Sequence, residues 1–234
     1  MSGGRRILIV GVGGVGCPTA MALARAGAGT LVLADADRVD ISNLHRQILF
    51  RTSDAGRPKV EAAAERLLEA HPGAVIETRR RRFDATTADS LLESIAVVVD
   101  GSDNFPTRFA ANDACVEAGV PLVHASALGW GGQILTVLPS HSACLRCVFE
   151  GPPPEGSVPT CARDGVLGPV AGVIGALAAA EASRVVGGQV PLHANSLLTY
   201  ESRRPEPFRA VPLRQRAGCV CSRGDATTAS SHAP

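Results

Sequence analysis

A glycine-rich turn near the start of the chain constrains its fold more than any other feature. The apolar run Ile7 to Val10 is followed by Gly-Val-Gly-Gly-Val-Gly over 11–16 and then by an alanine-rich stretch. This order predicts a strand, a tight turn and a helix. A turn without Cβ atoms lets the backbone approach a phosphate closely, and a helix N-terminus offers unpaired N–H groups. The glycines that would form such a site are Gly11, Gly13, Gly14 and Gly16.

A second apolar run, Thr30 to Asp35, ends in a carboxylate. In dinucleotide-binding units an acidic residue about 20 positions after the glycines holds a ribose hydroxyl, and Asp35 occupies that place. The glycine turn by itself is also consistent with tight packing of a helix on a sheet. Its setting between a strand, a helix and a second strand favours a nucleotide site.

The rest of the pattern predicts an α/β fold with a Rossmann-like, doubly wound and mostly parallel sheet. The second apolar run has no polar face, as in a parallel sheet covered by helices on both sides. We expect one domain over 1–221 and a disordered tail over 222–234, which is rich in Ala, Ser and Thr. Other predicted features are a turn over 129–132, a long crossover loop over 139–165, a buried helix over 168–186, and antiparallel C-terminal strands over 195–201 and 208–212.

Composition argues against several classes of protein. The 234 residues carry a formal net charge of +1, which gives no reason to expect nucleic acid or an acidic membrane as a partner. Aromatic residues make up 3% of the chain, which disfavours a base-stacking surface. The most apolar stretch, 166–180, is shorter than the roughly 20 residues of a membrane span. We therefore expect a cytoplasmic protein that binds neither nucleic acid nor membrane.

Polar side chains follow the second predicted strand. The segment 37–47 contains Asn43 and Arg46, whose amide and guanidinium groups suit phosphate oxygens. Lys59 stands at the start of the next helix, where a cation is unfavourable unless an anion lies near. These residues indicate a phosphate site, and a solvated loop with an exposed lysine is the alternative. The arginine run 79–82 is interpreted as a solvated strand end.

Carboxylates follow another buried strand, predicted over 95–99. Asp100 and Asp103 come at its end, where carboxylates can hold Mg²⁺ together with phosphate and water oxygens. The alternative is helix capping, because Asp103 or Asn104 could cap the helix that follows.

Seven cysteines are present, and we expect ligands, reactive thiols or core residues rather than disulfides. Cys144 and Cys147 have the spacing of half a zinc site. Cys17 and Cys115 fall within predicted helices and are interpreted as core residues.

Taken together, these segments resemble the ubiquitin-activating-type adenylyltransferases, whose bacterial members are ThiF, MoeB and HesA. The resemblance runs from about Arg5 to Cys221. Over residues 29–35, 46–50 and 160–170 the sequence is more similar to ThiF than to the other members. The segments that carry it, in order, are the glycine turn 11–16, Asp37 to Gln47, Arg57-Pro58-Lys59 and Asp100 to Asn104.

The resemblance implies an activity. Such enzymes join the C-terminal carboxylate of a small ubiquitin-fold sulfur carrier, which ends in Gly-Gly, to the α-phosphate of ATP and release pyrophosphate. The carrier then receives sulfur for thiamin thiazole synthesis (ThiS) or molybdopterin synthesis. The implied partners are this carrier, a second copy of the chain in a homodimer, and a sulfur donor such as a cysteine desulfurase.

The resemblance also assigns residues. Asp103 would bind Mg²⁺, and Cys161 matches a ThiF cysteine that links covalently to its carrier. A structural zinc would be held by Cys144, Cys147, Cys219 and Cys221. The implied catalytic residues are Arg46, Lys59, Asp103 and Cys161. The implied nucleotide-binding residues are Gly11, Gly13, Gly14, Gly16, Asp35, Asp37, Asn43, Arg46, Gln47, Lys59, Asp103 and Asn104.

The sequence departs from the family pattern at two places. The family's second cysteine pair is Cys-x-x-Cys, whereas Cys219 and Cys221 are one residue closer. Such a pair can still bind one metal with a smaller bite angle; the alternatives are a lost metal or free thiols. Bacterial relatives carry an arginine-bearing segment before the first strand, where this sequence has Met1 to Gly4. The missing arginine favours one alternative, a non-catalytic relative that binds ATP or carrier. Two further alternatives are a MoeB-like role and an NAD-dependent oxidoreductase. The last has no use for Asn43, Gln47 or Asp103.

Overall fold

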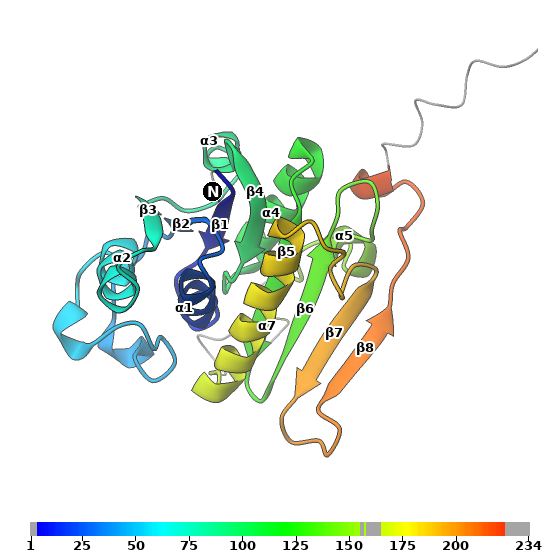
Figure 1. The fold of residues 1–234 in the computed structure, drawn as a ribbon. Helices are drawn as coiled ribbons and strands as arrows, with labels where there is room; N and C mark the ends of the chain where they lie inside the picture. The colour runs from blue at the N-terminus through cyan, green and yellow to red at the C-terminus, as the bar shows by residue number, and fades with distance from the viewer. Residues whose placement is uncertain (1–3, 155–156, 158–164, 223–234) are drawn as a thin grey trace, which may run out of the picture.

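The computed structural model describes residues 4–154, 157 and 165–222. Over these residues the strands form one eight-stranded sheet in the order β3-β2-β1-β4-β5-β6-β7-β8 (Figure 1). The pairs from β3 to β5 are parallel and those from β5 to β8 are antiparallel. This confirms the predicted fold class. The strands are β1 (Arg6–Val10), β2 (Thr30–Ala34), β3 (Val75–Arg79), β4 (Ile95–Asp100), β5 (Leu122–Leu128), β6 (Gly131–Val137), β7 (Ser196–Glu201) and β8 (Phe208–Pro212).

Helices cover both faces of the sheet. In Figure 1, α1, α2 and α7 lie in front of the strands, and α3 and α4 lie behind them. Alternate residues of β1 divide between the two faces: Ile7 and Ile9 pack in the core under α1, α2 and α7, whereas Leu8 and Val10 pack toward α3 and α4. The helices are α1 (Gly16–Ala26), α2 (Lys59–Ala70), α3 (Ala88–Leu92), α4 (Phe105–Ala118), α5 (Leu145–Val148) and α7 (Gly168–Val186), with short 3-10 turns at Ile41–Asn43 and Thr52–Asp54.

Close packing of α7 explains several glycines. A Cβ on Gly175 would lie 2.5 Å from Pro18 Cγ and 2.6 Å from Val15 O, so glycine lets α7 approach α1. A Cβ on Gly132 of β6 would lie 2.4 Å from Ile174 Cγ1. By length and composition α7 could cross a membrane, yet here it packs on α1 and on β4, β5 and β6. It is therefore a helix of the core, as predicted.

The structure corrects some predicted boundaries. Gly131 and Gly132 belong to β6 rather than to a turn. A Cβ on Gly131 would lie 2.7 Å from Tyr200 O of β7, and one on Gly132 would meet Ile174 of α7, so close neighbours select glycine at both positions. β3 ends at Arg79, so the arginine run continues into a loop. The long crossover contains the short helix α5. Cys17 and Cys115 are fully buried in the core, as predicted. Residues 155–156, 158–164 and the tail 223–234 lie outside the described residues.

Candidate functional site

A cavity opens where the carboxyl ends of β1, β2 and β4 meet. Ligands bind at this edge in open α/β sheets. The sequence had placed twelve nucleotide-site residues along the chain, and ten of them line this cavity, whereas Gly16 and Asn43 do not. The ten are Gly11, Gly13, Gly14, Asp35, Asp37, Arg46, Gln47, Lys59, Asp103 and Asn104.

The glycines of the first turn have different reasons to be glycine. Gly11 has φ +83°, and it lies against the turn after β4. A Cβ at this position would be 3.1 Å from Gly101 O, so both the backbone angle and the close contact favour glycine. A Cβ on Gly16 would be 1.9 Å from Gly11 O, so this glycine serves helix packing on the turn. Gly13 and Gly14 meet no such constraint: the nearest atoms to their added Cβ would be at 3.7 and 3.5 Å. At these two positions the missing side chain leaves the cavity floor open.

The Asp35 carboxylate organises the floor of the cavity. Its Oδ2 accepts a hydrogen bond of 2.8 Å from the Val12 N–H, and its Oδ1 accepts one of 2.8 Å from the Asp37 N–H. Asp37 in turn forms an ion pair of 3.1 Å with Lys59 Nζ. Lys59 is buried at the start of α2, so the protein itself supplies an anion for this cation. A bound phosphate would compete with an exposed carboxylate for Lys59.

Two buried polar atoms in the wall of this cavity lack a hydrogen-bond partner among the described residues. They are Gln47 Oε1 and Ser102 Oγ. Unpaired buried polar atoms are costly, and functional sites are one reason for their presence. The half-buried Arg46 lies nearby and donates to Asn43 Oδ1. Asn43 thus orients Arg46 without lining the cavity itself.

The turn after β4 separates the roles of its polar residues. Asn104 Oδ1 accepts a hydrogen bond from the Thr107 N–H, so Asn104 caps α4. Asp100 is fully buried and its carboxylate is bonded to Ser102 N–H and to His124. The exposed Asp103 carboxylate has no hydrogen bond or ion pair with any residue that the structure describes. Of the two aspartates, only Asp103 is open to a cation.

Sequence reasoning missed part of the cavity wall. Arg81 and Arg82 line it from the loop after β3, and Ser102 and Arg108 line it from the segment after β4. The arginines after β3 were interpreted as a solvated strand end, and they are indeed exposed. The available signal was their place, since β3 pairs with β2 and ends at the same edge of the sheet.

A second cavity adjoins the first and is largely apolar. Its volume is about 410 Å³. It shares Asp103, Arg108 and Ala127 with the first cavity, so the two meet beside the Asp103 carboxylate. No motif in the sequence pointed to it. Its other lining residues include Phe105, Phe109, His124, Ser126, Gln133, Leu145 and Phe149.

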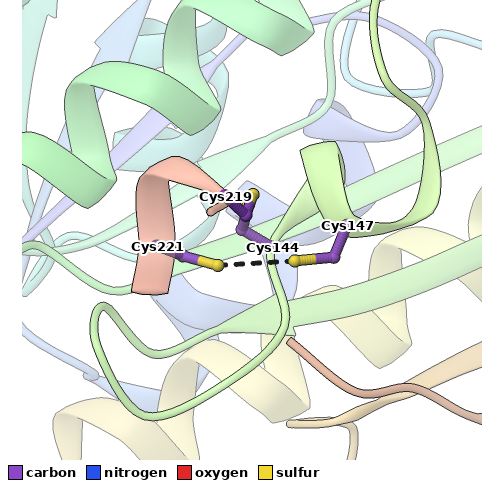
Figure 2. A group of neighbouring side chains, drawn as sticks. All are labelled: Cys144, Cys147, Cys219 and Cys221. Atoms are coloured by element: carbon purple, nitrogen blue, oxygen red, sulfur yellow. Dashed lines mark hydrogen bonds between the residues drawn. The ribbon is translucent and has the colours of Figure 1, made fainter. Parts of the chain in front are cut away.

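The four predicted zinc ligands come together at one place, as Figure 2 shows. Their Sγ atoms all lie within 4.8 Å of one another, with Cys144 and Cys219 at 3.6 Å and Cys147 and Cys221 at 3.4 Å. Tetrahedral zinc with Zn–S bonds of about 2.3 Å would place sulfurs about 3.8 Å apart. The cluster is therefore compatible with zinc, and the shorter Cys-x-Cys pair does not prevent convergence.

Thiol acidity in the cluster depends on burial. Burial raises the pKa of Cys144 to about 11 and raises that of Cys221 further. For Cys147, burial also opposes ionisation, but hydrogen bonds, the largest from the Arg216 N–H at 3.3 Å, bring its pKa below the usual value. Such N–H···S contacts support metal-bound thiolates. The remaining predicted cysteine, Cys161, lies outside the described residues.

Residues 4–222 match the ThiF family. The sulfur carrier protein adenylyltransferase of Thermus thermophilus is 40% identical over 228 residues, covering 95% of this chain and 83% of that protein. The adenylyltransferase and sulfurtransferase MOCS3 of Dictyostelium discoideum is 42% identical over 225 residues, covering 95% of this chain and 52% of that protein. The chain thus spans about half the length of the MOCS3 relative.

Solved structures share the fold at lower identity. The crystal structure of E. coli MccB with ATP superposes with a TM-score of 0.83 at 22% identity, over 95% of this chain and 68% of that chain. The structure of PaaA superposes with a TM-score of 0.73 at 19% identity, over 91% and 65% of the two chains. At these identities the likeness concerns the arrangement of the strands and helices.

Proposed function

The chain belongs to the ThiF family, and from this membership we propose that it adenylates the C-terminal carboxylate of a small sulfur-carrier protein with ATP. The observation that carries the proposal is the junction of two cavities at Asp103. One cavity is rich in cations and glycine, and the other is apolar and adjoins it. Two substrates can therefore meet at one carboxylate.

The first cavity suits ATP. The open floor at Gly13 and Gly14 and the unpaired Gln47 Oε1 and Ser102 Oγ are features that a bound nucleotide would complete. Asp35, already tied to the glycine turn through the Val12 N–H, would hold the ribose. The cations that would face the phosphates are Arg46, Lys59, Arg81, Arg82 and Arg108.

The reaction requires alignment and charge neutralisation. A carboxylate oxygen of the carrier forms a bond to the α-phosphorus, and the bond from that phosphorus to its bridging oxygen breaks. Pyrophosphate leaves with the electron pair. The attacking carboxylate is ionised at neutral pH, so no general base is needed. Arg46 and Lys59 would neutralise charge on the phosphates, and Asp103 would hold Mg²⁺, which supplies further charge stabilisation.

The second cavity suits the end of the carrier chain. The last two residues of a tail that ends in Gly-Gly have no side chains to obstruct entry into the cavity. Phe105, Phe109 and Phe149 give the cavity an apolar wall, and it ends beside Asp103 and Arg108. A carboxylate that arrives there lies next to the nucleotide cavity.

The proposal extends to assembly and pathway. We propose a ThiS-type carrier in thiamin thiazole formation, and a molybdopterin-type carrier is the alternative. Residues 1–221 would act as one adenylation domain within a cytoplasmic homodimer, and zinc would occupy the four-cysteine cluster. Cys161 remains the candidate for a covalent link to the carrier, with sulfur supplied by a donor such as a cysteine desulfurase.

The test is ATP–pyrophosphate exchange with the full chain, Mg²⁺ and purified carriers of both types. Exchange that requires a carrier is the expected result, because it reports formation of the acyl-adenylate. A carrier without its terminal Gly-Gly is the control and should give none. ATP binding without exchange for either carrier would contradict the proposal and indicate a non-catalytic relative.

Two glycine variants separate ligand binding from folding. Gly13→Ala should fold normally and bind ATP about tenfold more weakly, because its methyl group enters space that the protein leaves open. Gly16→Ala should cost about 3 kcal/mol of stability, because its methyl group would meet Gly11 O at 1.9 Å. Thermal unfolding and ATP titration of both variants provide the measurement. Equal ATP affinity in Gly13→Ala and the unaltered chain would contradict the placement of the nucleotide.

A further inference from the structure

A buried pair of ionisable side chains lies beside the second cavity. Asp100 ends β4, and His124 is its neighbour on β5. Their side chains are 0% and 1% exposed, and His124 Nδ1 lies 2.9 Å from Asp100 Oδ2. The reaction described above does not use this pair. A buried charge is costly unless it is paired and hydrogen-bonded, so the pair requires an explanation.

The hydrogen bonds fix which ring nitrogen of His124 faces Asp100. Asp100 Oδ1 accepts a bond of 3.0 Å from the Ser102 N–H. Burial opposes ionisation of Asp100, but the hydrogen bond to His124, the charges of His124 and Arg108, and the bond from Ser102 outweigh it and lower the pKa of the carboxyl. An ionised carboxylate can only accept, so His124 Nδ1 carries the hydrogen. Nε2 is then the ring nitrogen that remains available for a hydrogen bond to another group.

The position of His124 indicates which group could form a hydrogen bond with Nε2. His124 forms part of the wall of the second cavity, which is otherwise largely apolar. Apart from its terminal carboxylate, a Gly-Gly tail in that cavity offers only its peptide groups for recognition. Peptide groups that leave water need hydrogen-bond partners. Among the described lining residues, His124 is the one held in place by a buried carboxylate.

We propose that His124, oriented by Asp100, is a positioning residue that makes a hydrogen bond at Nε2 with a peptide group of the carrier's C-terminal tail. This inference rests on the proposed function. It assigns to His124 the alignment of the tail, and through the tail the approach of the terminal carboxylate to Asp103. The ordinary structural role, in which His124 only satisfies Asp100, predicts different behaviour in variants.

Two substitutions at His124 separate the hydrogen bond at Nδ1 from the one at Nε2. In His124→Asn the side-chain amide can still donate to Asp100 from the place of Nδ1, but nothing replaces Nε2. In His124→Gln a polar atom can reach the place of Nε2, but the bond to Asp100 is lost. His141→Asn is the matched control, because His141 is exposed and lines neither cavity.

We expect His124→Asn to raise the KM for the carrier about tenfold, the effect of losing one buried hydrogen bond, while the KM for ATP and the Tm stay unchanged. His124→Gln should lower the Tm, because the buried carboxylate loses its partner, and should affect the KM for the carrier less. The dissociation constant for the carrier, measured by calorimetry without turnover, should rise more in His124→Asn than in His124→Gln.

An unchanged KM and affinity for the carrier in His124→Asn would overturn the inference. Parallel changes in both KM values and the Tm would overturn it as well, in favour of a purely structural pair. In either case the unaltered chain would still show exchange. Failure of the proposed function is a separate result, in which the unaltered chain shows neither exchange nor carrier binding.

Discussion

Replacing Asp103 with asparagine is expected to lower carrier-dependent pyrophosphate exchange about a thousandfold while the fold and the affinity for metal-free ATP are kept. Asp103 stands where the two cavities meet, and its carboxylate is exposed and unpaired among the described residues. An asparagine keeps the shape but removes the charge that would hold Mg²⁺. Loss of about 4 kcal/mol of transition-state stabilisation corresponds to that factor.

The measurement is the exchange rate as a function of Mg²⁺ concentration, together with thermal unfolding. Asp89→Asn is the matched control, since Asp89 is an exposed aspartate on α3 that lines neither cavity. It should leave the Mg²⁺ dependence unchanged. Full exchange by the Asp103 variant at the same Mg²⁺ concentration would contradict the assignment of Asp103 as the Mg²⁺ ligand.

Replacing Cys219 with serine is expected to release zinc and to lower the Tm by about 10 °C. Cys219 Sγ lies 3.6 Å from Cys144 Sγ, so its loss removes one of four convergent ligands. The cluster joins α5 to the segment after β8, two parts of the chain that are 75 residues apart at this contact. A loss of about 3 kcal/mol gives that shift, at roughly 2–4 °C per kcal/mol for a chain of this size.

Zinc content by elemental analysis is the deciding measurement, with one ion per unaltered chain expected. Cys115→Ala is the control: Cys115 is also fully buried, so its removal should destabilise the core but leave the zinc content unchanged. Exchange should persist in the zinc-depleted protein at temperatures where it stays folded, because four protein ligands leave no open position for chemistry. A purified chain without metal that unfolds at the same temperature with and without added zinc would refute the structural role.

Much of the fold could be predicted because local signals agreed with one another. The run Ile7 to Val10 is buried on both faces, and the glycines after it take the turn that the pattern indicated. The helix Gly168–Val186 has the bounds that its apolar run predicted. The glycines at 131 and 132 were misplaced because local sequence cannot distinguish a turn from a strand that needs room for a neighbouring strand or helix.

The candidate site was predicted best at residues whose role follows from residue type and short-range spacing. Asp35, Arg46, Lys59 and Asp103 come together at one cavity as their motifs implied. Arg81 and Arg82 were missed because their meaning depends on β3 lying beside β2. The pair of Asp100 and His124 was missed for the same reason, since 24 residues separate its members and only the parallel pairing of β4 with β5 joins them.

The sequence by itself determined the family, the strand and helix order, and the residues able to bind phosphate, because these depend on residue type and short spacing. Only the tertiary structure decided which glycines serve packing and which leave space, which aspartate is open to a cation, and that a second cavity meets the first at Asp103. Those properties depend on strand order and on contacts between residues far apart in the chain, and they arise when the sheet brings the strand ends to one edge.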